Sequence, residues 1–365
     1  MRRLKKHIVA VWNRYERHIS VAALASGFAF DLYLAKSPES VSDNLLLLAY
    51  LLLAGAIIIV LNRRTRRQME KSSPTEPLIL TFVLQFCFGG LASSLLILYG
   101  KSGTAGTGAL FVLLLAGFLI GNELLKSRYA QLQFTVGIYY FLLLTYVVMA
   151  IPTFILHRVG TGVFIVSGLV SVVYMACFIA IIFVVVFRRK HKRYIYELSG
   201  IVLGVYVLFT GLYFTNVIPP VPLSLKQGGI YHTLLRDTSG NYTVTFEAPP
   251  RYVFWRDTSA TFTYGPEQTA YCFSAVYAPS NLATSIVHRW QQYDEQKQLW
   301  ETKSVVSFPI NGGREGGYRG WSLKVGLAAG KWRCNVETTR GQLIGRIRFD
   351  AVEASTLPAL STTTL

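Results

Sequence analysis

Seven apolar runs of membrane-spanning length occupy the first 218 residues of this 365-residue chain. Each run is about 16 to 25 residues long, and a helix of about 20 residues crosses a bilayer core of roughly 30 Å. In lipid the backbone must satisfy its own hydrogen bonds, so such runs form helices. The sequence therefore predicts an α-helical membrane bundle of seven transmembrane helices over residues 19–218. The runs cover residues 19–35, 45–62, 77–99, 107–122, 132–156, 163–187 and 198–218.

Basic residues are distributed unevenly among the loops that join these runs. Of the 21 Lys and Arg before Pro219, 18 lie in the N-terminal tail and in every second loop, and the others are Lys36, Lys101 and Arg158. Cytoplasmic loops of membrane proteins carry such an excess. The pattern predicts a cytoplasmic N-terminus and, after seven crossings, a C-terminal part outside the cytoplasm. The same pattern accounts for the net charge of +17, so the basic composition does not imply that the protein binds nucleic acid.

The first 18 residues form a basic segment with an apolar stripe. At helical spacing, Leu4, Ile8 and Trp12 lie opposite Arg3 and Lys6. A helix of this kind lies on the surface of an anionic lipid bilayer, and a disordered basic tail is the alternative. Both interpretations place residues 1–18 in the cytoplasm.

Ionisable side chains are missing from the middle of the predicted helices. Transporters commonly carry such groups near the bilayer midplane, so their absence argues against ion-coupled transport and leaves a pore or a flippase. A water-filled cavity that reaches Gln85, Thr145 or Tyr174 would be the sign of either. These three polar residues lie within the predicted helices.

A polar cluster is predicted at the membrane interface, at the inner end of the fourth helix. If the side chains of this cluster converge on one point, they would indicate a membrane-embedded enzyme. More commonly, polar residues at this depth contact water and lipid headgroups. The cluster consists of Asn122, Glu123, Lys126 and Arg128.

Small residues recur at helical spacing in three of the predicted helices. Pairs of this kind let helix backbones approach closely. Packing within one bundle is the ordinary interpretation, and a homodimer through the Gly-rich faces is the alternative. The residues are Gly90 with Ser94, Gly117 with Gly121, and Gly200 with Gly204 and Gly211.

The region after the membrane part has the pattern of a β domain. Pro219, Pro220 and Pro222 indicate a stiff linker over residues 219–229. Residues 230–353 contain short runs of β-forming residues between turn signals, and "KWRCNVET" alternates the apolar Trp332 and Val336 with polar residues. This pattern predicts an all-β antiparallel sandwich, either immunoglobulin-like or a small barrel, followed by a flexible tail at residues 354–365.

Two of the four cysteines, Cys272 and Cys334, lie on predicted strands of this outer domain. If the compartment is oxidising, a disulfide between them contributes about 4 kcal/mol in the chain-entropy description. Two unpaired buried thiols are the alternative. No pair of Cys or His has the spacing of metal ligands, so neither a metal nor another cofactor is expected.

The glycine-rich stretch "NGGREGGYRGWSLK" at residues 311–324 matches neither a dinucleotide-binding fingerprint nor a P-loop. It predicts a hairpin connection between two strands. Arg314, Tyr318, Arg319 and Trp321 nevertheless combine guanidinium groups with aromatic faces. They are therefore candidate binding residues for an anionic lipid, a glycan or a protein edge. A core position for Trp321 is the alternative.

His288 is the strongest candidate for acid–base chemistry, and it is better explained as structural. It shares a predicted strand face with Ile286 and Trp290, which favours a hydrogen-bonded core histidine over a catalytic one. No catalytic residue is predicted.

Several motifs of the outer domain resemble a known family. "VHRWQQYD", "FPINGGREGGYRGWSLK", "GKWRCNVET" and "GQLIGRIRF" are together similar to the bacterial domain of unknown function numbered 2914, over residues 272–352. Such domains often end polytopic inner-membrane proteins of proteobacteria, and "GNELLKSRY" at residues 121–129 is similar to their membrane region. The resemblance implies a Gram-negative inner membrane and a periplasmic outer domain. It implies no catalytic residue and no ligand.

These observations predict a non-enzymatic, multi-pass inner-membrane protein. Its helical bundle anchors a periplasmic β domain that binds or organises an envelope component, which is a protein, a lipid or a glycan. A transporter or flippase with a periplasmic cap is the first alternative, and a membrane-embedded enzyme is the second.

Overall fold

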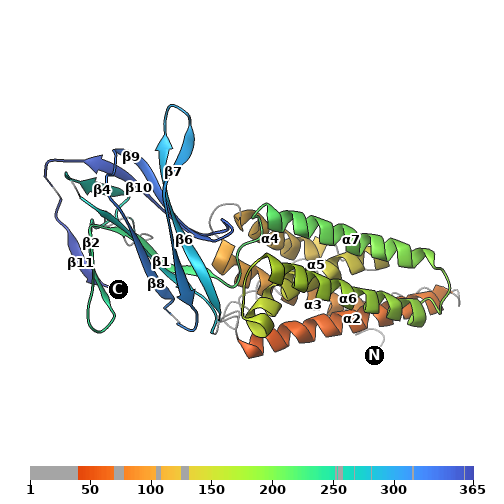
Figure 1. The fold of residues 1–365 in the computed structure, drawn as a ribbon. Helices are drawn as coiled ribbons and strands as arrows, with labels where there is room; N and C mark the ends of the chain where they lie inside the picture. Colours follow the sequence, from red (N-terminus) through yellow and green to blue (C-terminus); the bar gives the residue numbers. More distant parts are fainter. Residues whose placement is uncertain are drawn as a thin grey trace, which may run out of the picture. The chain divides into compact units, whose positions relative to one another are not determined.

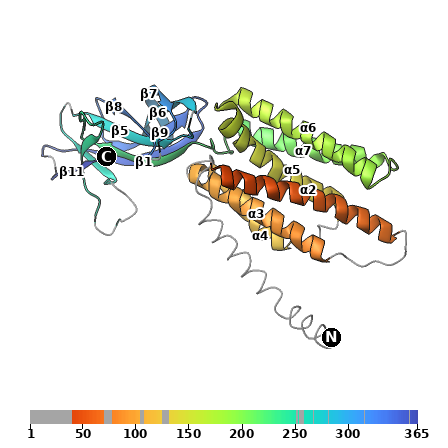
Figure 2. The same cartoon turned by 90° about the horizontal axis from the view of Figure 1, so that it is seen from below.

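The computed structural model describes residues 40–69, 78–103, 108–124, 131–250, 253, 258–266, 268–280, 282–314, 316–356 and 358–365. The chain divides into two compact units, one helical and one rich in β-strands (Figures 1 and 2). The basic segment at residues 1–18 and the first apolar run at residues 19–35 lie outside the described residues.

The helical unit contains six described α-helices and one π-helical turn. Five segments are long and apolar enough to cross a membrane, whereas Gly108–Gly121 is a shorter apolar helix. The prediction of seven transmembrane helices is therefore corrected to six described helices, five of spanning length, because one run lies outside the described residues and α4 is too short. The elements are α2 (Val41–Met69), α3 (Leu78–Gly103), α4 (Gly108–Leu124), α5 (Leu132–Ala150), η2 (Ile151–Leu156), α6 (Thr161–Val185) and α7 (Arg193–Phe214).

Glycines inside the helical unit make room for tyrosine rings. A Cβ atom on Gly55 would lie 2.8 Å from the hydroxyl oxygen of Tyr139, and one on Gly90 would lie 2.7 Å from a ring carbon of Tyr50. The Tyr139 hydroxyl also contacts the Tyr174 hydroxyl at 2.7 Å. Small residues therefore allow large polar-tipped side chains to cross between neighbouring helices, where the hydroxyls find partners.

Eleven strands form three sheets in the described part of the β-rich unit, with orders β1-β5-β8, β4-β10-β9-β6-β7 and β11-β3-β2. Every pairing is antiparallel except β4 with β10, which is parallel. The prediction of a purely antiparallel domain is wrong at this ladder, because β4 and β10 are far apart in sequence and meet by a crossover rather than a hairpin. The strands are β1 (Ser224–Tyr231), β2 (Thr233–Arg236), β3 (Tyr242–Phe246), β4 (Thr261–Tyr264), β5 (Ala270–Tyr277), β6 (Ala283–Asp294), β7 (Leu299–Asn311), β8 (Tyr318–Lys324), β9 (Gly330–Thr338), β10 (Leu343–Glu353) and β11 (Ser361–Thr364).

The first two sheets enclose one apolar core, in which Trp290 and Trp332 are the largest side chains. A disulfide between Cys272 on β5 and Cys334 on β9 joins the sheets, and Trp290 is paired with Cys334 in the ladder of β6 and β9. Trp332, two positions before Cys334, donates a 2.8 Å hydrogen bond from Nε1 to the carbonyl of Ala328. An inter-sheet disulfide with a buried tryptophan packed against it also occurs in immunoglobulin domains.

The third sheet covers the outer face of β5. Phe273 and Ala275 on β5 pack with Tyr231, Tyr242 and Val244 in a second apolar cluster. As a result β5 is buried on both faces, so its sequence is a continuous run rather than an alternating one.

Two predicted boundaries change in this unit. β1 begins at Ser224, inside the predicted linker at residues 219–229. The predicted flexible tail contains β11, which pairs with β3 from Ser361 opposite Phe246 to Thr364 opposite Thr243. Threonine favours strands, and β3 offers an edge that a further strand can pair with, so these residues are ordered.

Candidate functional site

The outer face of the five-stranded sheet carries a cluster of arginines and amide side chains. The strand alternation that buries Trp332, Cys334 and Val336 in the core turns their neighbours to this outer face. We refer to the cluster as the basic face. Its members are Arg289 and Gln291 on β6, Trp300 on β7, Arg333, Asn335 and Glu337 on β9, and Arg346 and Arg348 on β10.

The register of the strands places two of these arginines directly opposite each other. Arg348 pairs with Arg333, and Arg346 pairs with Asn335. On the other side of β9, Arg333 pairs with Gln291. Directly opposite residues have Cβ atoms about 4.5 to 5.5 Å apart, so Arg333 and Arg348 place two positive charges side by side.

Hydrogen bonds from Nε fix the orientation of three guanidinium groups. A guanidinium held through Nε still presents the edge formed by its two Nη atoms, which is the edge that can grip an oxyanion with two parallel bonds. The bonds run from Arg289 to Glu337 Oε2 at 2.9 Å, from Arg333 to Gln291 Oε1 at 2.8 Å and from Arg346 to Asn335 Oδ1 at 2.7 Å.

The groups beneath the arginines are themselves fixed. Asn335 and Glu337 are only 3% and 6% exposed, and Asn335 Nδ2 donates to Glu337 Oε1 at 3.0 Å and to Gln291 Oε1 at 3.1 Å. The guanidinium carbon of Arg333 lies 4.1 Å from the ring centroid of Trp300. Connected buried networks of this kind hold side chains in one arrangement, so the arginines are positioned before any ligand arrives.

The basic face has an excess of positive charge. Burial, and after it the charges of Arg346 and Arg348, lower the pKa of Arg333 to about 10, while the charge of Glu337 acts in the opposite direction. Burial and Arg348 also lower the pKa of Arg346. With a pKa of about 10, Arg333 remains charged at neutral pH. The face contains four arginines and one carboxylate. This excess of positive charge attracts anions.

The four residues predicted to bind at the glycine-rich stretch do not form one site. The guanidinium carbon of Arg314 lies 5.3 Å from the ring centroid of Tyr318, and Tyr318 packs against the sandwich core. Arg319 and Trp321 lie on the opposite face of β8 because strand residues alternate. Trp321 is 41% exposed with its ring 6.0 Å from that of Tyr271, so a core position for Trp321 is wrong. A binding role for these residues stays a prediction.

The glycine-rich stretch itself turns the chain, but it does not close a hairpin. β7 and β8 belong to different sheets, so the segment between them crosses the sandwich. Gly313 and Gly317 have φ angles of +91° and +86°, which favour glycine. A Cβ atom on Gly312 would lie 1.7 Å from the carbonyl oxygen of Pro279, so glycine is required there by close backbone approach.

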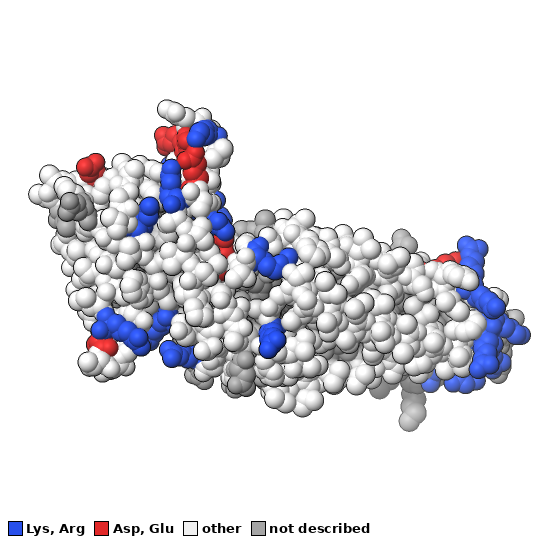
Figure 3. Space-filling view, in the orientation of Figure 1, with Lys and Arg blue, Asp and Glu red and all other residues white. Residues whose placement is uncertain are grey.

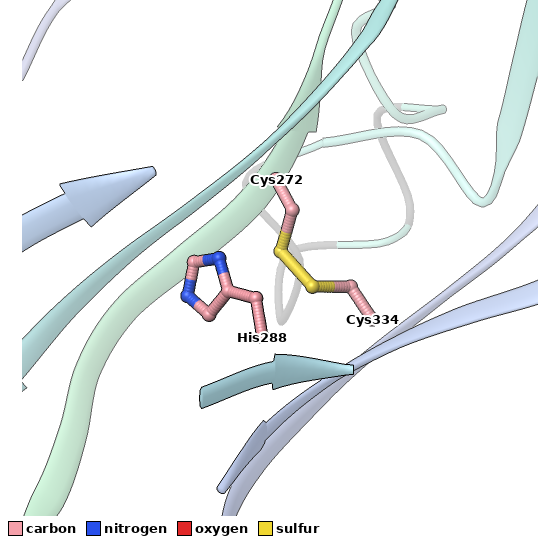
Figure 4. Close-up of side chains that lie close together, drawn as sticks. All are labelled: Cys272, His288 and Cys334. Atoms are coloured by element: carbon pink, nitrogen blue, oxygen red, sulfur yellow. A yellow bond between two sulfur atoms is a disulfide. The ribbon is translucent and has the colours of Figure 1, made fainter. Parts of the chain in front are cut away.

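His288 lies in the core beside the disulfide (Figure 4). Its Nε2 is 2.7 Å from Ser274 Oγ and its Nδ1 is 2.9 Å from Ser322 Oγ. Burial lowers the pKa of His288 to about 4. The ligand atoms of Cys272, His288 and Cys334 lie within 4.8 Å of one another, but the two sulfurs are bonded together and both ring nitrogens are occupied by serines. The cluster is structural, as the strand-face argument predicted for His288.

The structure describes only some of the polar residues in the helical unit that would indicate transport or membrane-embedded catalysis. Thr145 is buried and donates from Oγ1 to the carbonyl of Phe141 at 2.7 Å, and Tyr174 pairs with Tyr139. Both groups are therefore engaged inside the unit. The side chains of residues 122 and 123, and residues 126 and 128 entirely, lie outside the described part of the chain, so the interface cluster stays a prediction.

The glycines of α7 have no close neighbour among the described residues. A Cβ atom added to Gly200, Gly204 or Gly211 would meet no described atom within 4 Å, and the same is true of Gly117. These four glycines therefore pack against none of the described helices, whereas Gly90 does pack against a neighbouring helix. Packing within one bundle stays a prediction for the four. The predicted homodimer interface on these faces stays untested.

Cationic side chains gather at one end of the helical unit (Figure 3). The guanidinium carbon of Arg66, near the end of α2, lies 3.9 Å from the ring centroid of Phe187 in the loop between α6 and α7. This contact joins the two basic segments that the loop pattern assigns to one side of the membrane. The cations are Arg63, Arg64, Arg66 and Arg67 from α2, and Arg188, Arg189, Lys190, Lys192 and Arg193 around the loop.

The strands that carry the basic face are also the part of the chain that resembles other proteins. Residues 283–351 match the protein family of unknown function DUF2914. This DUF2914 segment runs from the start of β6 into β10 and contains every member of the basic face. The basic face therefore lies entirely within the matched segment.

Other comparisons add little to the DUF2914 match. No curated protein matches this chain. Among solved structures, a similar chain is the Pseudomonas fluorescens alkylpurine DNA glycosylase AlkC bound to DNA containing an abasic site analog, with 8% identity, coverage of 87% of this chain and 99% of that chain, and a TM-score of 0.21. That score supports no inference about fold or function.

The basic face was missed by the sequence analysis, although part of its signal was present. Arg333 and Glu337 alternate with core residues in "KWRCNVET", and Arg346 and Arg348 do so in "LIGRIRFDA". Alternation shows that these residues share an outer surface. The register that places Arg348 opposite Arg333 is a tertiary property.

Proposed function

We propose that this chain is an inner-membrane protein whose β-rich unit binds an anionic component of the cell envelope through the basic face. The opposed pair of Arg333 and Arg348 carries the proposal. Like charges directly opposite each other destabilise a sheet, so folding alone does not favour this pair. An anion bound beside Arg333 would offset part of this repulsion, which is a reason for the chain to carry the pair.

The placement outside the cytoplasm rests on charge and on the disulfide. Basic residues concentrate in alternate loops of the helical unit, as they do on the cytoplasmic side of membrane proteins. Disulfides such as that between Cys272 and Cys334 persist in oxidising compartments such as the periplasm. Both observations support a periplasmic β-rich unit, which we infer to be an immunoglobulin-like sandwich.

The fold of this unit does not specify its activity, because sandwiches of this type have many functions. The basic face favours binding over catalysis, because it combines fixed cations with one aromatic ring. Transport and membrane-embedded catalysis remain alternatives suggested by the sequence. Neither gains a specific observation from the described residues.

Site-specific photo-crosslinking in intact cells tests this proposal. A crosslinking amino acid in place of Thr302 would stand on the basic face, since Thr302 Oγ1 accepts a 3.1 Å hydrogen bond from Gln291. We expect a discrete adduct that disappears with Arg348→Glu. A probe in place of Val325, which is 55% exposed and outside the face, is the matched control. Equal adducts from both probes, or an adduct unaffected by Arg348→Glu, would contradict the proposal.

The predicted orientation has its own test. Alkaline phosphatase fused after Leu365 is active only outside the cytoplasm, and the same enzyme inserted after Lys190 reports on the basic loop. We expect activity from the first fusion and none from the second. The reverse result would place the β-rich unit in the cytoplasm.

A further inference from the structure

We propose that the cationic end of the helical unit (Figure 3) binds the phosphate of an anionic phospholipid between α2 and the loop that follows α6. The site lies in the other unit of the chain, so it does not rest on the function proposed for the basic face. Three features support it: the place where the helices end, the way one guanidinium group is held, and the backbone of the loop. We call this site the headgroup site, and its members are Arg63, Arg66, Arg67, Arg188 and Arg189.

The headgroup site lies at helix ends where lipid headgroups are expected. The segments of α2 and α6 that are long and apolar enough to cross a membrane end at Arg67 and Val185, and that of α7 begins at Arg193. Arg66 on α2 contacts Phe187 just beyond α6, so these helix ends lie together within the helical unit. Helices that cross a bilayer end where the hydrocarbon meets the headgroups. The arginines at these ends are therefore within reach of lipid phosphates.

Arg66 is held in place by aromatic rings. Its guanidinium carbon lies 3.9 Å from the ring centroid of Phe187 and 5.2 Å from that of Tyr194. The two rings stack on each other with their centroids 4.4 Å apart, and Phe187 is buried. Contact with a ring orients a guanidinium without neutralising its charge. Arg66 is thus positioned, and still charged, before an anion arrives.

Within the described residues, acids do not balance the charge of the headgroup site. The carboxylate of Glu197 on α7 is engaged elsewhere, because Oε1 accepts a 2.7 Å hydrogen bond from Arg193 and Oε2 accepts one of 3.1 Å from Gln133. No described carboxylate forms a salt bridge with any member of the headgroup site. All members except Arg66 are exposed, so their guanidinium groups are accessible to a lipid headgroup.

The loop that follows α6 keeps an unfavourable backbone conformation. Arg188 and Arg189 have φ angles of +49° and +60°, and His191 has one of +63°. This left-handed region favours glycine, and among other residues asparagine and aspartate. Strain of this kind concentrates at functional sites and ligand clamps. A phosphate bound by the two arginines gives the chain a reason to keep them where glycine would fit the turn better.

The residue type favours phosphate as the bound group. Arginine binds phosphate with two parallel hydrogen bonds, whereas lysine acts as a point charge. On α2, Arg63 lies one helical turn from Arg66 and Arg67, so these three side chains share one face of the helix. A headgroup phosphate can therefore be held from α2 and from the loop at once. Basic sites between helices at the membrane surface bind anionic lipids in this way.

Native mass spectrometry of the full-length protein tests the proposal. The protein is released from nanodiscs that contain equal amounts of phosphatidylglycerol and phosphatidylcholine with the same acyl chains. We expect at least fivefold more phosphatidylglycerol than phosphatidylcholine to remain bound. Arg188→Asn and Arg189→Asn should each lower the bound phosphatidylglycerol at least fivefold, and asparagine tolerates the left-handed backbone. Equal retention of the two lipids by the unmodified protein would overturn the proposal.

Arg193→Gln is the matched control, because it also removes one positive charge from the same end of the helical unit. The guanidinium of Arg193 is already paired with Glu197, so bound phosphatidylglycerol should change less than twofold. An equal loss in Arg193→Gln and Arg188→Asn would show that the whole end attracts lipid without a defined site. That result would overturn the headgroup site.

Inorganic phosphate separates a lipid from a soluble phosphate compound as the ligand. A large molar excess of phosphate should leave the bound phosphatidylglycerol unchanged within twofold, because the acyl chains hold the headgroup at the membrane surface. Displacement of the lipid by phosphate would assign the site to a soluble ligand and overturn the lipid assignment. Circular dichroism and the elution volume of each variant show that a loss of lipid is not a loss of folding.

Discussion

Arg333 on β9 and Arg348 on β10 lie directly opposite each other in the five-stranded sheet. Neither partner is an acid, although an acid at one of the two positions would pair favourably with the other. Local rules of sheet stability are commonly broken at functional sites, where another requirement outweighs folding. The pair is therefore the feature of this structure that most directly separates a binding surface from a merely solvated one.

Replacing Arg348 by Thr should stabilise the β-rich unit while it weakens anion binding. Removal of the like charge opposite Arg333 and the higher strand propensity of threonine should raise the free energy of unfolding by about 0.5 kcal/mol. The electrostatic contribution to this gain in the free energy of unfolding should be smaller in 1 M salt, because exposed charges are screened. Denaturant unfolding followed by tryptophan fluorescence measures the change. Arg319→Thr is the control, since Arg319 faces Ala275, and an equal gain there would remove the electrostatic explanation.

His288 should make the β-rich unit less stable in acid. Burial lowers its pKa from 6.5 to about 4, so between these pH values the unfolded chain binds a proton that the folded chain does not. Stability should therefore fall as the pH falls from about 6.5 to about 4, by on the order of 3 kcal/mol. His288→Gln should flatten this dependence in unfolding curves measured across the range. An unchanged pH dependence in the variant would assign the effect to other groups.

The disulfide should contribute much of the stability of the β-rich unit. Cys272 and Cys334 are 62 residues apart, and the chain-entropy description gives about 4 kcal/mol for a loop of that size. The double variant with alanine at both positions should lose about this much in denaturant unfolding under oxidising conditions. Cys177→Ala, at a free and exposed cysteine of α6, should leave the unfolding of the β-rich unit unchanged. A similar loss in both variants would show that the measurement does not isolate the disulfide.

Two glycines of the stretch "NGGREGG" should respond very differently to substitution. A Cβ atom on Gly312 would lie 1.7 Å from the backbone oxygen of Pro279, whereas one on Gly316 would meet no described atom within 4 Å. Gly312→Ala must shift the backbone and should cost at least about 2 kcal/mol. Gly316→Ala should change stability by less than about 0.5 kcal/mol. Thermal unfolding of both variants provides the comparison, and equal melting temperatures would mean that the crossing segment adapts freely.

A homodimer through α7 predicts disulfide crosslinking at Gly204. With Cys177 replaced by serine to remove the exposed native thiol, Gly204→Cys should give a covalent dimer on mild oxidation in native membranes, because this glycine meets no described atom within 4 Å. Adding Gly200→Leu should reduce the yield, since close approach of two helices needs small residues. A dimer yield that does not respond to Gly200→Leu would point to random collision.

The position of the core histidine illustrates what local patterns can predict. His288 shares a strand face with Ile286 and Trp290, and all three are buried. The same alternation correctly separated the core residues of β9 from the polar ones. It failed for Trp321, which lies on the outer face of its strand, because one strand cannot show which of its faces meets the core. The assignment of residues 354–365 as a flexible tail failed for a related reason, since β11 is ordered by its pairing with β3.

Properties that depend on hydrophobicity and charge along short stretches of chain could be predicted from the amino-acid order. These are the apolar helices, the uneven loop charges, the β character after Pro219 and the presence of two cysteines on strands. Which strands are neighbours, and in which register they pair, became known only from the three-dimensional fold. Arg333 bonds to Gln291, 42 residues away, and is paired with Arg348 on another strand. A shift of one residue in register would turn these side chains to the opposite face, so the basic face exists only because distant strands pair as they do.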